Sequence, residues 1–171
     1  LVLGVNQVLK SVAEQAQALA QGKVDAVSVY SADDALGSVS KAIGDAAASV
    51  AALLAQQTAM SQRHDEGWID DVMPVQSSRG AFAAIAGGIN GLVASHIAVK
   101  FRIVEVVTAY ADGKLDQPMD RLPGKKAQIT EAIDRVQARL KAAADEAVQN
   151  LRVRNALDKC STNVMIADAT N

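Results

Sequence analysis

The chain has 171 residues, of which 50% are hydrophobic and only 3% aromatic, and its formal net charge is −2. A chain with this net charge lacks the excess of Lys and Arg that is typical of nucleic-acid-binding domains. The single cysteine, Cys160, excludes an intramolecular disulfide and favours a reducing, cytoplasmic compartment. Alanine and valine carry the apolar content, and side chains of this size suit narrow seams between helices. We therefore expect an all-α protein.

The first predicted helix covers about residues 1–21, where apolar side chains recur at spacings of three and four. Gly22 ends this helix, because a left-handed backbone at a helix C-terminus is favourable only for a residue without a Cβ. A polar connector over residues 23–34 follows. Either Asp33 or Asp34 then caps a second helix.

The same order of elements recurs twice more along the chain. The second helix meets no strong breaker before Gly67, and a connector over residues 68–79 leads into another long helix. That helix ends at Gly113, and a connector with two prolines precedes the last helix, which runs to about Leu157. The two middle helices therefore each end one repeat and begin the next.

Two sets of markers define the period of this repeat. The glycines are 45 and 46 residues apart (67 − 22 and 113 − 67), and an isoleucine follows each after 21, 22 and 20 residues. The step from an isoleucine to the next glycine is 24 residues in both cases, which is three heptads plus three residues. A single heptad pattern of core positions therefore cannot continue unbroken from one repeat into the next. We expect repeats over residues 1–48, 49–94 and 95–143, followed by a segment over 144–171.

No residue constellation for catalysis emerges, and we expect neither an enzyme nor a small-molecule substrate, cofactor or metal site in this chain. His64 and His96 are 32 residues apart and lack metal-ligand spacing. A structural role is the simplest interpretation for His64. His96 lies on the row expected to face the core, where it is either a packed residue or one that tunes packing with pH.

The stretch over residues 88–107 is the strongest candidate for a membrane span. It is interrupted by His96, Lys100, Arg102 and Glu105, so we expect no apolar run of the 18 or more residues that cross a bilayer.

The order of helix, Gly-x-(Val/Ile/Leu), extended connector and helix resembles the HAMP module, a signal relay of receptors and sensor kinases. Asp34-Ala35-Leu36-Gly37 matches the opening of that family's second helix, except that alanine replaces glutamate. "HDEGWIDDVMPV" and "MDRLPGKKAQITEAIDRV" are similar to the tandem HAMP array of soluble, aerotaxis-type methyl-accepting chemoreceptors. The tail over residues 156–171 is similar to the start of a PAS sensor domain, and PAS domains of such receptors often bind haem.

The resemblance implies a parallel homodimer in which each repeat is a four-helix bundle, two helices coming from each chain. It implies signal relay within a chemoreceptor, with the chemotaxis kinase and its adaptor as partners of a downstream domain. A HAMP array of a sensor histidine kinase and a non-switching coiled-coil spacer remain alternatives. The connector turns are expected at Gly22, Gly67 and Gly113, and the packing and relay residues are expected to be Val24, Ile43, Ile69, Ile89, Ile103, Leu115 and Ile133.

Overall fold

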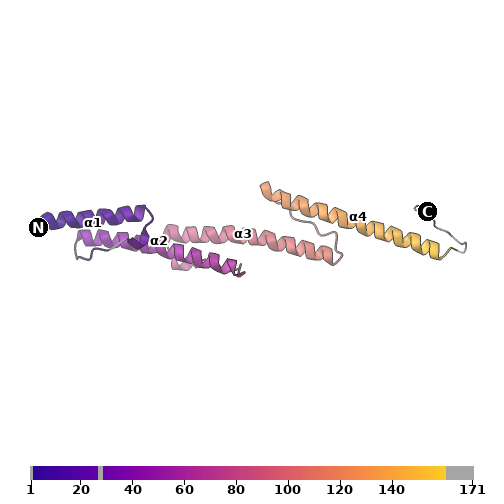
Figure 1. Ribbon diagram of the computed structural model, residues 1–171, viewed down its shortest axis with the longest axis horizontal. Helices are drawn as coiled ribbons and strands as arrows, with labels where there is room; N and C mark the ends of the chain where they lie inside the picture. The colour runs from indigo at the N-terminus through magenta and orange to yellow at the C-terminus, as the bar shows by residue number, and fades with distance from the viewer. Residues whose placement is uncertain (1, 27–28, 161–171) are drawn as a thin grey trace, which may run out of the picture. The chain divides into compact units, whose positions relative to one another are not determined.

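The computed structural model describes residues 2–26 and 29–160 of the chain. The described residues form helices and no strands, which confirms the all-α prediction (Figure 1). The expected PAS strand falls on residues 161–171, outside the described residues. The elements are α1 (Val2–Ala20), η1 (Val24–Ala26), α2 (Ala35–Asp65), η2 (Val75–Ser77), α3 (Gly80–Ala111), η3 (Gly124–Lys126) and α4 (Ala127–Asp158).

The chain divides into two compact parts, residues 1–97 and 98–171, which we describe separately. In the first part, α1 lies beside the N-terminal half of α2 (Figure 1). The C-terminal half of α2 packs with the start of α3 through the connector between them. In the second part, the C-terminal half of α3 packs with the connector that follows it and with α4. We call these three helix–connector–helix arrangements repeats 1, 2 and 3, and their connectors (residues 21–34, 66–79 and 112–126) connectors 1, 2 and 3.

The N-terminus of α2 confirms the predicted cap. The Asp34 backbone is extended, and its carboxylate Oδ1 accepts a hydrogen bond of 2.7 Å from the Gly37 N–H. This bond satisfies one of the backbone donors that have no partner within the first turn of a helix. Gly37 is buried, and a Cβ at this position would lie only 1.9 Å from the Ala32 carbonyl oxygen. Glycine therefore lets connector 1 pass close to the start of α2.

Helices α1, α2 and α3, which are the first helices of repeats 1, 2 and 3, end in the same hydrogen-bonded motif. Gly22, Gly67 and Gly113 have φ of +73°, +98° and +79°. The residue after each glycine donates its N–H to the carbonyl five residues earlier, which with the glycine's own bond is the pattern of a Schellman cap. These N–H···O distances are 2.9 Å for Lys23 to Ala18, 2.9 Å for Trp68 to Arg63 and 2.8 Å for Lys114 to Ala109.

This geometry gives opposite expectations for two glycine-to-alanine substitutions. Gly67→Ala should lower the free energy of unfolding by about 1 kcal/mol, because alanine is strained in the left-handed region. Gly91→Ala should raise it by up to about 1 kcal/mol, because Gly91 lies within α3 and, apart from the adjacent helix backbone, no atom lies within 4 Å of its Cβ position. Thermal unfolding of both variants at one protein concentration measures the difference. Equal effects of the two substitutions would contradict the motif at Gly67.

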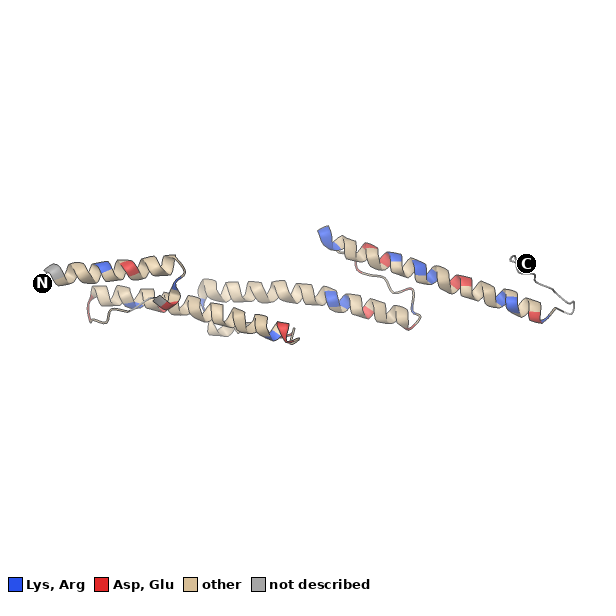
Figure 2. Ribbon diagram, in the orientation of Figure 1, with Lys and Arg blue, Asp and Glu red and all other residues tan. Residues whose placement is uncertain are grey.

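Helices α2 and α3 are long and apolar enough to cross a membrane, judged by length and composition alone. Residues 46–62 and 80–99 contain no Asp, Glu, Lys or Arg, and the ribbon carries no charged colour over these stretches (Figure 2). The expectation that no such stretch exists was therefore wrong, because it rested on residues 88–107 and missed the uncharged run that begins at Gly80. Only 11% of the α2 window and 6% of the α3 window are buried within the chain. The apolar faces of both helices are thus available for a further partner.

Candidate functional site

Each connector of repeats 2 and 3 inserts a methionine into an apolar cluster. In repeat 2, Met73 is 1% exposed and packs with Met60 of α2 and Ala86 of α3. In repeat 3, Met119 is 2% exposed and packs with α3 and α4 side chains. The second cluster consists of Val106, Tyr110, Met119 and Ile133, with Ile103, Leu115, Leu122 and Ile129 against it. A buried methionine fixes each connector to both of its helices, so the connector cannot move without opening the cluster.

The structure brings together some of the packing residues expected from the sequence. Ile89 packs against the cluster of repeat 2. Ile103, Leu115 and Ile133 belong to the cluster of repeat 3 or pack against it. Val24, Ile43 and Ile69 are half-buried and belong to neither cluster. Their role in a relay stays a prediction.

Several cluster residues were absent from the expected set although a regular signal marks them. Met60 and Val106 each lie seven residues before a connector glycine (67 − 60 and 113 − 106), and Met73 and Met119 each lie six residues after one (73 − 67 and 119 − 113). Alignment of the repeats on their glycines therefore locates these positions. Apolar spacing within a single helix does not, because the connector residues lie outside any helix.

A side-chain amide clamps connector 2 to α3. Asn90 Oδ1 accepts a hydrogen bond of 2.9 Å from the Met73 N–H, and Asn90 Nδ2 donates one of 2.9 Å to the Met73 carbonyl. Both backbone groups of the buried methionine are thus satisfied by one side chain. Because the Met73 N–H only donates and its carbonyl only accepts, the amide orientation of Asn90 is determined.

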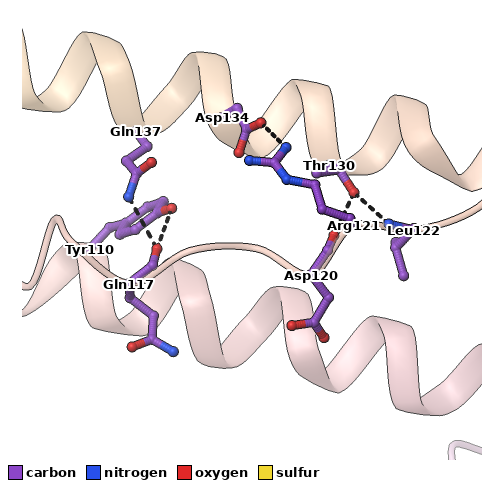
Figure 3. Close-up of polar contacts among 8 residues, drawn as sticks. All are labelled: Tyr110, Gln117, Asp120, Arg121, Leu122, Thr130, Asp134 and Gln137. Atoms are coloured by element: carbon purple, nitrogen blue, oxygen red, sulfur yellow. Dashed lines mark hydrogen bonds and ion pairs between the residues drawn. The ribbon is translucent and has the colours of Figure 1, made fainter.

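Thr130 and Gln137 of α4 hold connector 3 in a related way (Figure 3). The Thr130 hydroxyl donates to the Asp120 carbonyl at 2.7 Å and accepts from the Leu122 N–H at 3.2 Å. Gln137 Nε2 donates to the carbonyls of Leu115 and Gln117, at 2.6 and 3.2 Å. The connector backbone is therefore positioned by hydrogen bonds as well as by Met119.

The last turn of the first helix carries a ring that reaches the connector in repeats 2 and 3. His64 Nε2 lies 2.9 Å from the Asp71 carbonyl, and the Tyr110 hydroxyl donates to the Gln117 carbonyl at 2.9 Å. Both partners are seven residues further along the chain, and both rings lie three residues before a connector glycine (67 − 64 and 113 − 110). A carbonyl accepts only, so His64 must carry a proton on Nε2 in this bond. The role of His64 is therefore to hold connector 2.

The hydrogen bond between Tyr110 and connector 3 can be tested through the phenol of Tyr110. Tyr110 is 6% exposed, and burial raises the pKa of its phenol, with the nearby Asp134 carboxylate adding to the effect. A raised folded-state pKa means that the stabilisation is complete below about pH 10, the ordinary value for tyrosine, and is lost as pH rises through the folded-state pKa. Tyr110→Phe should lower the free energy of unfolding at pH 7 by about 1 kcal/mol through the lost hydrogen bond.

Urea unfolding of the wild type and Tyr110→Phe between pH 7 and pH 11 measures both effects. We expect the wild type to lose stability at alkaline pH more steeply than the variant, because only the wild type has this phenol to ionise. Parallel pH profiles would contradict a buried, neutral Tyr110.

Exposed ion pairs surround the clamps of repeat 3. Arg121 pairs with Asp134 (Figure 3), and Arg102 lies between Glu105, at 2.8 Å, and Asp120, at 3.4 Å. Lys141 Nζ donates to Asp116 at 2.7 Å, which lowers the pKa of that carboxyl. Pairs with this exposure to solvent add little stability. The pairs of Arg121 and Lys141 join connector 3 to α4, and the Arg102–Asp120 pair joins it to α3.

The structure does not support a core role for His96 within this chain, since His96 is exposed on α3. Ile89, seven residues before His96 on the same row of α3, packs against the cluster of repeat 2, but that cluster does not extend to His96. Within the described residues there is also no group of three or more His, Cys, Asp or Glu side chains that could hold a metal ion.

Comparison with known families matches the same two helix–connector–helix segments. Residues 47–95 match the family described as "Methyl-accepting chemotaxis protein McpB, second HAMP domain", and residues 99–141 match "HAMP N-terminal domain 3". Both matches support a HAMP array. The two segments contain connectors 2 and 3, so the methionine clusters and polar clamps described above lie within the HAMP matches.

One curated relative extends this likeness. The chain is 54% identical over 116 residues to the methyl-accepting chemotaxis protein McpB of Pseudomonas aeruginosa strain PAO1. The aligned region is 64% of this chain, and the chain spans 17% of the length of that relative. The likeness supports a HAMP array of a chemoreceptor and concerns this region alone.

Proposed function

We propose that this chain relays a signal between domains of a bacterial chemoreceptor through changes in the packing of its HAMP repeats. One observation carries the proposal: each connector of repeats 2 and 3 is held by a buried methionine and by side-chain clamps from both neighbouring helices. Displacing a connector therefore changes the contacts of two helices together. Helices α2 and α3 each serve two repeats, so such a change is passed along the chain.

The relay works as a parallel homodimer in this proposal. Each repeat contributes two helices, and large apolar side chains of α3 face away from the chain's own clusters. A second copy would cover these side chains and complete a four-helix bundle in each repeat. The most exposed of them on α3 are Leu92 (60%), Phe101 (60%) and Val104 (59%).

Covering by a second chain also accounts for the apolar composition of α2 and α3 without a bilayer. Both helices carry buried polar contacts to their connectors, as Asn90 does in α3. Such clamps fit a helix that packs on protein along one face. We therefore propose a cytoplasmic location for these repeats.

Switching requires two packing states whose free energies differ by only about a few kcal/mol. In the proposed mechanism, an input shifts the helices of one repeat, and its connector exchanges one set of cluster and clamp contacts for another. The residues on α3 that pack in repeat 2 (86, 89 and 93) and in repeat 3 (103, 106 and 110) fall about 100° apart on an ideal helix of 3.6 residues per turn. A rotation of α3 would therefore affect the two repeats differently.

The chain itself is proposed to be non-enzymatic and to bind no cofactor. A PAS domain that begins within residues 144–171, its haem and the response to oxygen rest on the sequence resemblance alone. So do the chemotaxis kinase and its adaptor as partners of the full-length receptor. A HAMP array of a sensor histidine kinase would use the same contacts with a different output domain.

Disulfide crosslinking tests both the dimer and the switching. Cysteines are introduced one at a time at the α3 positions 92–107, in a Cys160→Ser background because Cys160 is exposed. The full-length receptor is examined with and without oxygen, the stimulus that the resemblance implies. We expect strong crosslinking at Leu92→Cys and Val104→Cys, weak crosslinking at the buried Val106→Cys, and a pattern that changes with oxygen.

Three results would overturn parts of the proposal. A pattern identical in both conditions would leave a non-switching spacer. Sedimentation as a monomer at micromolar concentration would remove the homodimer. Flotation of the chain with phosphatidylcholine vesicles would assign the apolar faces of α2 and α3 to lipid.

A further inference from the structure

In each repeat, one buried residue from each of the two helices occupies a fixed position, and we call this pair of residues the layer of that repeat. The layer is polar in repeat 1 and largely apolar in repeats 2 and 3. Its two positions are fixed by the repeat: one lies seven residues before the connector glycine, and the other lies three residues before the marker isoleucine. All six side chains are buried, with exposed fractions of 0 to 6%. The pairs are Gln15 and Ser40 in repeat 1, Met60 and Ala86 in repeat 2, and Val106 and Thr130 in repeat 3.

Gln15 and Ser40 form a hydrogen-bonded chain that ends at connector 1. The Tyr30 N–H donates to Ser40 Oγ at 2.7 Å, and Ser40 Oγ donates to Gln15 Oε1 at 2.8 Å. Gln15 Nε2 is buried and has no hydrogen-bond partner within the described residues. The bond that fixes connector 1 to α2 thus leads to an amide whose donors are unsatisfied.

The corresponding layers of repeats 2 and 3 avoid this situation in two different ways. In repeat 2 the layer contains no side-chain donor or acceptor other than the methionine sulfur, and Asn90 holds the connector elsewhere. In repeat 3 the Thr130 hydroxyl both donates to and accepts from connector 3, opposite the apolar Val106. Neither layer buries an unpaired amide donor among the described residues. The unpaired amide atom of repeat 2 is an acceptor outside the layer: Oε1 of the half-buried Gln56, whose Nε2 donates to Ser77 Oγ at 2.8 Å.

We infer that the Gln15–Ser40 layer makes repeat 1 the repeat whose connector is released most readily, so that this repeat responds first to an input. When connector 1 moves away, water can reach the Gln15 amide and satisfy its donors, which offsets part of the cost of opening. When connector 2 or 3 moves away, Met60 or Val106 only loses apolar burial. The inference rests on the relay function proposed above.

Hydrogen exchange of the whole 171-residue chain tests the inference, with amides 29–44 compared with the corresponding amides 75–90 of repeat 2. We expect the wild type to exchange at least about tenfold faster in repeat 1. Gln15→Met, which introduces the residue found in repeat 2, should slow repeat 1 by about tenfold and leave repeat 2 unchanged. In this variant the Ser40 hydroxyl keeps its bond to connector 1 and can donate to a carbonyl of its own helix.

Matched variants separate the layer from fraying of the first helix. Gln17→Met changes an exposed glutamine of the same helix and should leave exchange unaltered. Met60→Gln places the amide in repeat 2 and should speed exchange there by about tenfold. If Gln15→Met precipitates, Gln15→Leu serves the same purpose.

Two results would overturn the inference: exchange in repeat 1 as slow as in repeat 2 in the wild type, or no slowing by Gln15→Met. A second measurement addresses the relay itself. If Gln15→Met slows exchange but leaves the output of the full-length receptor unchanged, the layer is confirmed as the soft point and the proposed relay fails. If exchange slows and the response weakens, both stand.

Discussion

Replacing Met119 by alanine is expected to destabilise repeat 3 by about 2–5 kcal/mol, the range for removing a buried methionine side chain. Met119 is 2% exposed and is the contribution of connector 3 to the cluster formed with α3 and α4. The connector backbone around it is held by Thr130 and Gln137, so it cannot simply collapse into the cavity. The upper part of the range is therefore expected.

Thermal and urea unfolding at a fixed protein concentration measures the effect, since dimerisation would make stability depend on concentration. Arg139→Ala, at an exposed position of α4, is the control and should change the free energy of unfolding by less than about 0.5 kcal/mol. A loss below about 1 kcal/mol for Met119→Ala would show that connector 3 does not depend on its methionine.

Replacing Asn90 by alanine is expected to cost about 2–3 kcal/mol, because both backbone groups of the buried Met73 lose their hydrogen-bond partner. The Met73 amide should also exchange much faster with solvent. Asn90→Asp separates the two bonds: its carboxylate still accepts from the Met73 N–H but cannot donate to the Met73 carbonyl.

The Asp variant should therefore keep part of the protection of the Met73 amide while losing stability. Asn150→Ala, an exposed asparagine of α4, is the matched control. Equal protection of the Met73 amide in the wild type and in Asn90→Ala would contradict the clamp.

The helices and their ends could be predicted from local signals. Asp34 caps α2, and Gly22, Gly67 and Gly113 have the left-handed backbone that helix-ending glycines adopt. Both signals act over one or two helical turns and are therefore readable in a single sequence. The boundaries of the repeats, and the roles assigned to Val24, Ile43 and Ile69, stay predictions.

The clamps could not be predicted, because each depends on which helix face meets the connector. Asn90, Thr130 and Gln137 are ordinary polar residues of long helices, and nothing nearby in sequence marks them as partners of a connector. The exposure of His96 within one chain could not be predicted either. A heptad-like row placed His96 toward the core, and Ile89 and Ile103 of that row, seven residues before and after it, do pack, but the described chain leaves His96 itself exposed.

The shared cap has a consequence for how such arrays are lengthened or shortened. Because Gly67 and Gly113 end their helices with the same hydrogen bonds, the 46 residues from Gly67 to Asp112 (113 − 67) can be exchanged as one module. Removing them joins Glu66 directly to Gly113 and preserves both the cap and the seven-residue step from Met60 to the glycine. An insertion or deletion that does not begin and end at corresponding positions of two repeats alters that step or the spacing to the next isoleucine. Arrays are therefore expected to differ in length by whole modules. Duplication and excision of complete repeats are the simplest route by which arrays of different length arise.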